Sequence, residues 1–410
     1  MALDDQQLSV IVVGSGLAGL AAARILREKH RVIVYERGVP SVATGGQGIC
    51  NFPNAINIMR QLGYNPQNSG SVPIQGFRTV DKHGNLIYDT EYRFEEKYGA
   101  PALAHMRVDF RAELLRLATA PSKDLGIGGK PAKVVFNNGA KDINPEAGEI
   151  ILDDGTKVKA DVVIVADGIH SRLRPKIAGP DCPKPQKSGL TCCRIAVSAN
   201  EAIEALGRLP DWWQEQLNGD SRIIIFEARD GSDRIMVIYG LRNMTYMNMS
   251  CIYVTEEEKE STTNSWMAEG NRQEMLDKFH DFDPSVKKLL GVATEVKVWE
   301  LQDLEPLDRW ALGRAILIGD AAHAMTPMQG QGANIGIEDA EAFRLLMQPG
   351  VTRDDVPAIL KRIDDVRKPR ASRVLDNTRQ MSRGISGEER YRVMDDNCTY
   401  HGIFEALKGH

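Results

Sequence analysis

The sequence predicts an α/β protein with a parallel sheet that is covered by helices. A second sheet, mixed or antiparallel, is inserted into this fold, and the chain ends in helices. Three aliphatic runs, at 8–13, 161–166 and 315–318, share one pattern: an apolar strand, a turn with glycine or aspartate, then a helix. Between the last two runs the sequence has the pattern of consecutive antiparallel strands. From 354 to about 382 it is rich in charged residues and has helical periodicity.

The composition is that of a globular chain with a substantial core. It has 410 residues, of which 42% are hydrophobic and 26% are charged, and this length exceeds one ordinary domain. These values exclude wholesale disorder, collagen and coiled coil. The formal net charge of −5 argues against nucleic acid or an anionic membrane as the main partner, because both favour a basic surface.

Membrane, secretion and metal signals are not evident. No apolar run approaches the roughly 20 residues that span a bilayer, and residues 1–7 are too polar and acidic for a secretory signal. The six cysteines show no C-x-x-C spacing, and no His/Cys/Asp cluster has metal-ligand spacing. We therefore expect a cytoplasmic protein with reduced thiols, no membrane span and no metal site.

The first forty residues form one predicted βαβ unit. A strand at 8–13 leads through a glycine-rich turn into an alanine-rich helix that extends to about residue 29, and a second strand follows at 31–36. Apolar strands separated by a helix indicate a parallel sheet with both faces covered. We expect the strands at 161–166 and 315–318 to join this sheet, so that the turns after all three strands meet at one ligand site.

The middle of the chain predicts a separate sheet. Runs at 222–226, 234–239 and 246–254 have the pattern of consecutive antiparallel strands. The stretch 121–155, rich in Gly, Pro, Asn and Asp, indicates loops around a hairpin. The predicted division is a discontinuous nucleotide-binding domain of 1–182 and 301–350, an inserted sheet domain of 183–300 and a helical segment of 351–410.

Gly14 to Gly19 has the form G-x-G-x-x-G between a predicted strand and a predicted helix. In such a Rossmann-like turn, Gly14 permits the tight bend, Gly16 lets a pyrophosphate approach the backbone, and Gly19 lets the helix pack on the strand. Glu36 ends the second strand, where a carboxylate accepts hydrogen bonds from an adenosine ribose and disfavours a 2′-phosphate. FAD or NAD therefore fits this site better than NADP.

Three further segments carry a resemblance to a known family. Gly319 to Asn334 resembles the second FAD motif of the single-component flavoprotein aromatic hydroxylases, and Val165 to Arg172 resembles their Asp-Gly motif. The segments Gly46 to Ala55 and Met106 to Phe110 resemble the salicylate-hydroxylase-like branch, which includes fungal enzymes of secondary metabolism. The resemblance implies an FAD-binding domain of the p-hydroxybenzoate hydroxylase type and FAD as the cofactor.

The resemblance also implies particular FAD contacts. Asp320, at a strand end, is expected to bind the ribityl chain; the alternative is an aspartate that caps the following helix. The helix that begins near Gln331 is expected to turn its free N–H groups toward the flavin. Asp167 either shapes the cofactor cleft or only closes a turn with Arg172. The remaining expected contacts are Arg37, Gly48, Arg107, Pro327, Gly332, Ala333 and Asn334.

One position departs from the family pattern. The family usually has proline after the histidine of its Asp-Ala-Ala-His motif, whereas Ala324 follows His323 here. The replacement makes a turn less rigid, but it leaves Asp320 and the glycines of the motif unchanged. His323 could be a catalytic base, but we expect it to pack within the turn.

Two residues are the candidates for catalysis. Arg194 matches the position of an arginine at the flavin–substrate boundary in fungal relatives, and Tyr239 lies in a strand that resembles the family's Tyr-Pro-x-Arg strand, with Gly240 in place of proline. An arginine stabilises a phenolate by a charge-assisted hydrogen bond, and a tyrosine can donate or relay a proton. The alternatives are a surface salt bridge for Arg194 and a core aromatic for Tyr239.

The predicted function is FAD-dependent, NAD(P)H-consuming hydroxylation of a small aromatic, phenolic substrate by O₂. In the resembled family NADH or NADPH reduces FAD transiently, and a flavin C4a-hydroperoxide then delivers one oxygen atom. A flavin-dependent epoxidase or reductase of a non-phenolic natural product, and a non-catalytic FAD-binding protein, stay open as alternatives. The W-x-W-x-I-P signature of flavin halogenases and the G-x-S-x-G elbow of α/β-hydrolases are not found in the sequence.

Overall fold

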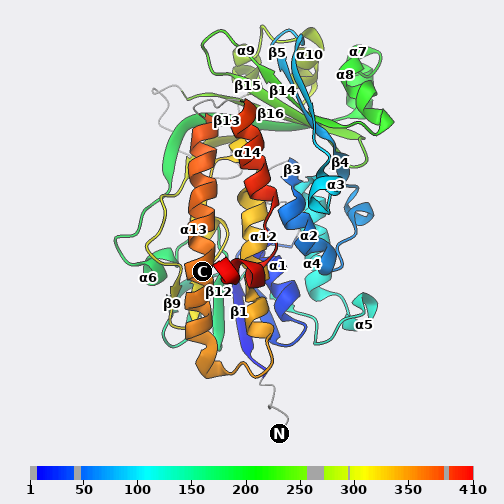
Figure 1. The fold of residues 1–410 in the computed structure, drawn as a ribbon. Helices are drawn as coiled ribbons and strands as arrows, with labels where there is room; N and C mark the ends of the chain where they lie inside the picture. Colours follow the sequence, from blue (N-terminus) through cyan, green and yellow to red (C-terminus); the bar gives the residue numbers. More distant parts are fainter. Residues whose placement is uncertain (1–6, 41–47, 256–271, 294–295, 383–386, 410) are drawn as a thin grey trace.

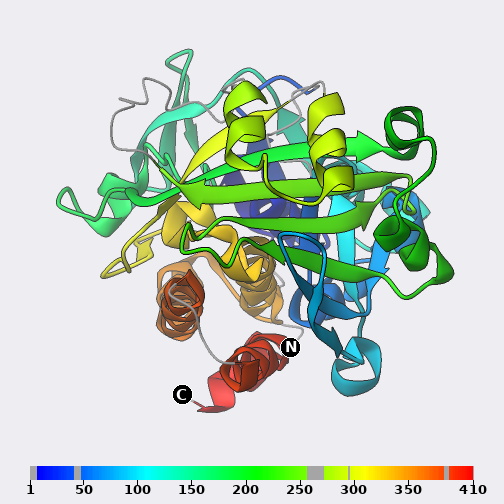
Figure 2. The ribbon, with the colours of Figure 1, turned by 90° about the horizontal axis from the view of Figure 1, so that it is seen from above.

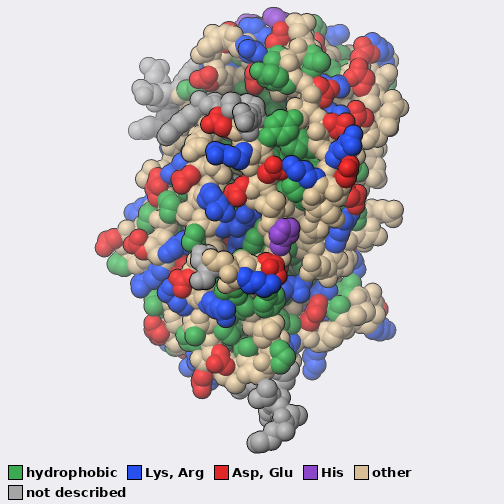
Figure 3. All heavy atoms as spheres, in the orientation of Figure 1, with side chains coloured by type: hydrophobic (Ala, Val, Ile, Leu, Met, Phe, Trp, Pro, Cys, Tyr) green, Lys and Arg blue, Asp and Glu red, His purple; other side chains and the backbone are tan. Residues whose placement is uncertain are grey.

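The computed structural model describes residues 7–40, 48–255, 272–293, 296–382 and 387–409. Figure 1 shows two layers along the long axis of the molecule, with a parallel sheet in the lower half and a larger sheet at the top. Helix α13 (Val356–Ser382) runs alongside both layers. On the face that Figure 3 shows, Lys and Arg are interspersed with Asp and Glu.

The lower sheet has the strand order β18-β19-β12-β1-β2-β8. Its strands are β1 (Ser9–Val13), β2 (Arg31–Tyr35), β8 (Lys133–Val135), β12 (Val162–Val165), β18 (Ala311–Leu312) and β19 (Ala315–Leu317). All pairs are parallel except β18 with β19. The prediction that three distant aliphatic runs share one sheet is confirmed, because β1, β12 and β19 are neighbours. Every residue of β12 is buried, as expected for a strand covered on both faces.

The stretch 121–155 contains the expected hairpin, formed by β9 (Ala140–Asn144) and β10 (Glu149–Leu152), to which β11 (Lys157–Lys159) adds a third strand. It also supplies β8 to the edge of the parallel sheet. The sequence did not reveal β8, because the strand has only three residues and begins with an exposed lysine.

The upper sheet has the strand order β17-β13-β16-β15-β14-β5-β6. Its strands are β5 (Gly76–Asp81), β6 (Leu86–Glu91), β13 (Gln186–Ser198), β14 (Arg222–Glu227), β15 (Ile235–Leu241), β16 (Tyr246–Val254) and β17 (Lys297–Asp303). The three consecutive antiparallel strands are confirmed as β14, β15 and β16. However, the sheet also includes β5 and β6, which lie far before residue 183. The division into domains stays a prediction.

The two faces of the upper sheet differ because side chains alternate along a strand. One face, with Ile195, Met249 and Cys251, packs against α7 (Ala199–Leu206), α9 (Arg272–Lys278) and α10 (Pro284–Val292). Figure 2 shows α9 and α10 lying across this face. The opposite face meets a small sheet of β3 (Gly48–Asn51), β7 (Ala102–Met106) and β4 (Val72–Ile74). This second, inner face therefore points toward the parallel sheet.

The chain ends in the predicted helices, which are α13, α14 (Gly387–Cys398) and α15 (Ile403–Ala406). Among the described residues, no helix combines the length and the apolar character that a membrane span requires.

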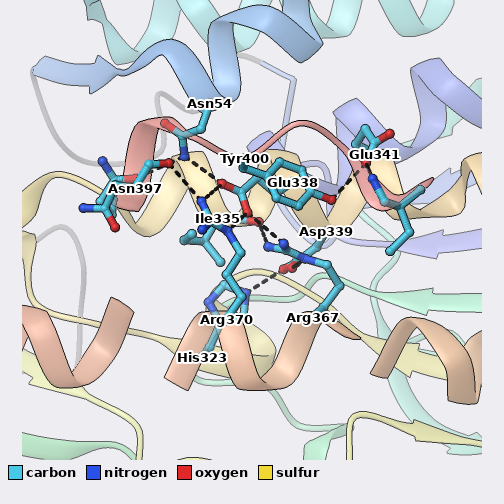
Figure 4. Close-up of polar contacts among 12 residues, drawn as sticks. Asn54, His323, Ile335, Glu338, Asp339, Glu341, Arg367, Arg370, Asn397 and Tyr400 are labelled. Carbon is cyan, nitrogen blue, oxygen red and sulfur yellow. Dashed lines mark hydrogen bonds and ion pairs between the residues drawn. The ribbon is translucent and has the colours of Figure 1, made fainter. Parts of the chain in front are cut away.

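A network of buried charges joins α13 to α12 (Gly332–Ala342), and Figure 4 shows it. The Arg367 guanidinium lies 2.7 Å from Glu338 and 3.0 Å from Asp339, and all three side chains are fully buried. Arg370 donates to both oxygens of Glu338 at 2.6 and 2.7 Å. Burial alone would raise the pKa of Glu338, but the two arginines lower it overall.

The same carboxylates hold the neighbouring elements. Asp339 accepts hydrogen bonds from the Gly319 N–H at 3.0 Å and pairs with His323 Nε2 at 2.6 Å. Glu338 accepts from Asn54 on α2 (Pro53–Gln61) at 2.7 Å. His323 is buried beside the Trp310 ring, so it packs within the turn as expected.

We predict that Arg367→Met destabilises the FAD-loaded protein by about 3–5 kcal/mol, because it leaves two buried carboxylates without their shared cation. Lys361→Met is the matched control, since Lys361 lies on the same helix and pairs with Asp365 on the surface. We expect the control substitution to lower the free energy of unfolding by less than about 1 kcal/mol. Urea unfolding followed by circular dichroism compares the two variants. Equal losses would show that the buried network is not a principal source of stability.

Candidate active site

The three glycines of the first turn meet different constraints. Gly14 has φ +103°, and a Cβ there would lie 2.3 Å from the Ala166 carbonyl oxygen. A Cβ on Gly19 would lie 2.2 Å from the carbonyl oxygen of Gly14. In contrast, Gly16 has an ordinary φ of −71°, and no atom lies within 4 Å of the position of its Cβ. The protein itself therefore does not require glycine at 16, and the free space suits a phosphate group at the start of α1 (Leu17–Leu26).

Glu36 follows β2 and closes onto the same turn. One carboxylate oxygen accepts from the N–H and the hydroxyl of Ser15 at 2.7 and 2.8 Å, and the other accepts from the Gly38 N–H at 2.7 Å. Burial alone would raise the pKa of Glu36, but these hydrogen bonds lower it overall. Since each carboxylate oxygen has two acceptor positions, the group can still accept a hydrogen bond from a ribose hydroxyl.

Arg111 is a site residue that the sequence reasoning missed. It lies on α4 (Arg107–Thr119) and donates to the carbonyl of Ser15 at 3.0 Å and to its hydroxyl at 2.6 Å. Its spacing of four residues from Arg107, on one face of a helix, was the available signal. Arg37, by contrast, is exposed and packs beside Gly139, so a contact with the cofactor stays a prediction.

Asp320 is the first residue of α11 (Asp320–His323) and follows β19 through Gly319. Gly319 occupies the N-cap position of this helix, which does not fit the alternative that Asp320 serves as its cap. One carboxylate oxygen lies 4.0 Å from the position of a Cβ on Gly332. Asp320 therefore faces the start of α12.

The start of α12 presents backbone donors. The N–H groups of Gly332, Ala333 and Asn334 are in the first turn, where a helix offers them no acceptor. Pro327 lies in the short 3₁₀ helix (Pro327–Gln329) before them. The Asn334 side chain is used within the protein: it accepts from the Phe52 N–H at 2.8 Å and donates to the Gly330 carbonyl at 2.8 Å. Only the backbone of Asn334 is thus available to a ligand.

Arg107 begins α4, where its charge interacts with that of Asp320, and its buried Nε has no hydrogen-bond partner. Burial lowers the pKa of Arg107; the carboxylate of Asp320 opposes this effect, whereas the positive charges of Arg194 and Arg111 add to it. Two neighbouring guanidinium groups of like charge favour an anionic group between them.

Arg194 lies on the inner face of the upper sheet, at the centre of β13. Its buried Nε has no hydrogen-bond partner, and its guanidinium lies 5.2 Å from the centre of the Trp299 ring. Burial alone would lower the pKa of Arg194, but Cys192 and Tyr239 raise it overall. Arg194 is only partly exposed and its Nε is buried, which does not fit the alternative of a surface salt bridge.

Tyr239 is buried on β15 and points toward β3. Burial raises the pKa of Tyr239 well above its ordinary value, and its hydroxyl hydrogen-bonds to the Cys50 thiol. A Cβ on Gly48 would lie 2.6 Å from the Tyr239 hydroxyl, so packing against Tyr239 is one reason for glycine there. The hydroxyl is protonated at neutral pH and can donate a hydrogen bond.

Asp167 follows β12 and closes the predicted turn, while its role at the cofactor cleft stays a prediction. One oxygen accepts from the Arg172 N–H at 3.1 Å, which closes the turn, and the other is buried without a partner. Burial raises the pKa of Asp167. The Arg172 guanidinium is exposed and lies 3.8 Å from Asp153, not from Asp167.

Together these groups fit FAD. The free space at Gly16 and the acceptor of Glu36 suit the adenosine diphosphate part, Asp320 suits the ribityl chain, and the start of α12 with Arg107 suits an electron-rich ring edge. In the part of the chain that is described, no group of three or more His, Cys, Asp or Glu side chains could hold a metal ion. The fold and the site define an FAD-binding oxidoreductase.

Comparison with known proteins confirms this class. Residues 7–378 match the FAD binding domain family, and the chain belongs to this family of FAD-dependent monooxygenases. Hispidin-3-hydroxylase of Neonothopanus nambi is 30% identical over 378 residues, which cover 90% of this chain and 87% of the relative. Salicylate hydroxylase of Pseudomonas putida is 29% identical over 388 residues, with coverage of 90% and 83%.

Solved structures agree with the fold. A salicylate hydroxylase substrate complex superposes with a TM-score of 0.72 at 27% identity, and the match covers 95% of this chain and 93% of the other. CtdE in complex with FAD and a substrate gives a TM-score of 0.78 at 23% identity, with coverage of 92% and 89%. The predicted fold class and the predicted FAD cofactor are therefore confirmed.

We predict that Gly16→Val strips FAD from the purified protein, because the side chain fills the space for the pyrophosphate. Gly291→Val is the matched control, since Gly291 also has an ordinary φ and no atom within 4 Å of its Cβ position. Asp320→Ala should also weaken the binding of FAD. The absorbance of bound flavin per mole of protein measures retention. Full retention in Gly16→Val and Asp320→Ala would disprove this placement of the cofactor.

We predict that Glu36→Ala weakens FAD binding by about 1–3 kcal/mol, the cost of leaving a polar partner unsatisfied. Titration of the apoprotein with FAD, followed by flavin fluorescence, gives the dissociation constant. Because Glu36 also holds Ser15 and Gly38, the urea midpoint of the apoprotein is measured in parallel. An unchanged dissociation constant would show that the ribose binds elsewhere.

Proposed function

We propose that this enzyme hydroxylates a phenolic ring bound between Arg194 and the start of α12, at the expense of NADH or NADPH and O₂. The observation that carries the proposal is the position of Arg194: a guanidinium with an unpartnered buried Nε, on the sheet face that points toward the cofactor site. Relatives named for hydroxylation of salicylate, hispidin and 6-hydroxynicotinate support an aromatic substrate.

The chain's own residues prepare the substrate. When bound, FAD takes electrons from the nicotinamide and activates O₂. Arg194 favours the phenolate over the phenol, because its positive charge stabilises the anion, and the phenolate ring is the better nucleophile. Tyr239 stays protonated, and its single O–H turns from the Cys50 thiol to donate a hydrogen bond to the same oxygen or to a neighbouring substituent. The apolar side chains around these groups exclude water from the reacting atoms.

The cellular setting is also a proposal. The six cysteines form no disulfide in the structure, which agrees with a reducing compartment such as the cytoplasm.

We predict that Arg194→Ala still binds FAD and that NAD(P)H still reduces this FAD. NAD(P)H oxidation should, however, no longer be coupled to hydroxylation, so that hydrogen peroxide forms in place of the product. Arg194→Lys should recover only part of the coupling, since a point charge lacks the planar fork of a guanidinium. Arg78→Ala is the matched control, because Arg78 lies on β5 of the same sheet and pairs with Asp89 and Glu215.

The measurement is the ratio of product formed to NAD(P)H consumed, with peroxide assayed in parallel. The substrate is first found by screening phenolic acids for stimulated NAD(P)H oxidation. Parent-like coupling in Arg194→Ala would show that another group holds the phenolate, whereas an uncoupled Arg78→Ala would point to a general disturbance of the sheet.

A further inference from the structure

We propose that Asn248 is a specificity-determining residue, and that the substrate is an aromatic ring with two polar substituents. One substituent is an acidic hydroxyl that faces Arg194, and the other is a hydrogen-bond donor, such as a second hydroxyl or an amine, that faces Asn248. This inference rests on the proposed function, because it assigns a second contact within the same substrate site.

The Asn248 amide is only half satisfied. Its side chain is fully buried, and its Nδ2 donates to the Ser250 hydroxyl at 3.2 Å. Its Oδ1 is buried with no hydrogen-bond partner. Asn334 is equally buried, but both ends of its amide are bonded within the protein. A buried acceptor without a partner is unfavourable unless something from outside the chain supplies the donor.

The strand register places this acceptor beside the proposed phenolate site. Asn248 lies directly opposite Tyr239 on β15, and its strand neighbour Ser250 lies opposite Arg194 on β13. Side chains at such positions share one face, with Cβ atoms about 4.5–5.5 Å apart when opposite and about 7–8 Å apart when diagonal. Arg194 and Asn248 are diagonal neighbours, so a single ring can meet both groups.

Contacts with β3 show that Asn248 reaches across from the sheet. A Cβ on Gly48 would lie 2.8 Å from Asn248 Cγ and 2.6 Å from the Tyr239 hydroxyl. The other neighbours on this face include the apolar side chains of Ala196 and Val237. A leucine has nearly the shape of asparagine and would suit such apolar surroundings without an unsatisfied oxygen, so packing alone does not account for the amide.

Other unpartnered amide oxygens occur among the described residues, at Asn51, Asn54, Asn138 and Asn397. Asn248 differs from them because it lies on the same sheet face as Arg194, whose Nε is also unpartnered. The two groups have opposite hydrogen-bonding capacities: the guanidinium can only donate a hydrogen bond, and the amide oxygen can only accept one. A ring with one ionised hydroxyl and one donor satisfies both, whereas a ring with a single hydroxyl leaves Oδ1 unsatisfied.

The test compares ligand pairs in which one member has the second donor and the other lacks it. The probes are 2,4-dihydroxybenzoate and its 4-methyl ether, resorcinol and 3-methoxyphenol, and 3-aminophenol and phenol. Binding is followed by the change in visible absorbance of bound FAD, without NAD(P)H, so that no turnover is needed. In the parent protein we expect the donor-bearing member of each bound pair to bind at least about tenfold more tightly.

Asn248→Leu should remove this preference while FAD affinity stays as in the parent. Met249→Leu is the matched control, because Met249 is the next residue of β16 and faces the opposite side of the sheet; it should keep the preference. Asn248→Asp should also keep the preference, since a carboxylate still accepts. If Asn248→Leu does not fold, Ser250→Ala, which releases the amide from its bond, should reduce the preference.

Several results would overturn the inference: no preference in the parent, no binding by any donor-bearing probe, or a preference that survives in Asn248→Leu. Loss of FAD from Asn248→Leu would assign the amide to the cofactor instead, and loss of the preference in Asn248→Asp would show that the amide nitrogen faces the ligand. The proposed function fails by a different result, namely parent-like coupling in Arg194→Ala, so the two failures are distinguishable.

Discussion

The position of helix α12 depends on two arginines of α13 that bind two fully buried carboxylates, Glu338 and Asp339. Because an unpaired buried charge is very unfavourable, each partner fixes the other's place. Asp339 also accepts from the Gly319 N–H, next to Asp320, and Glu338 accepts from Asn54. This one network thus orients the start of α12, the side chain of Asp320 and the neighbouring helix α2.

With α12 fixed, the site is formed where two sheets face each other. The parallel sheet and its helices supply Glu36, Asp320 and Arg107, and the upper sheet supplies Arg194 and Tyr239. The unpartnered Nε atoms of Arg107 and Arg194 and the free N–H groups of α12 all favour negative charge at this junction. An anionic substrate oxygen and an electron-rich flavin edge would both meet that requirement.

The sequence predicted those features whose signals are local. The glycine turn, Glu36, the three aliphatic strands and the start of α12 each follow from a short pattern with a physical cause. The strands β5 and β6 were missed because they join the upper sheet from a distant segment and β6 is largely exposed. The internal use of the Asn334 amide and the packing role of Gly48 depend on tertiary contacts, which no local pattern encodes.

A crystal structure of the protein with FAD and a bound phenolic ligand tests this account most directly. We expect the flavin ring at the start of α12, near the N–H groups of Ala333 and Asn334, and the ligand oxygen within hydrogen-bond distance of Arg194. A flavin ring bound away from α12, or an Arg194 side chain turned toward solvent in the complex, would contradict the claim that the active site lies between the two sheets.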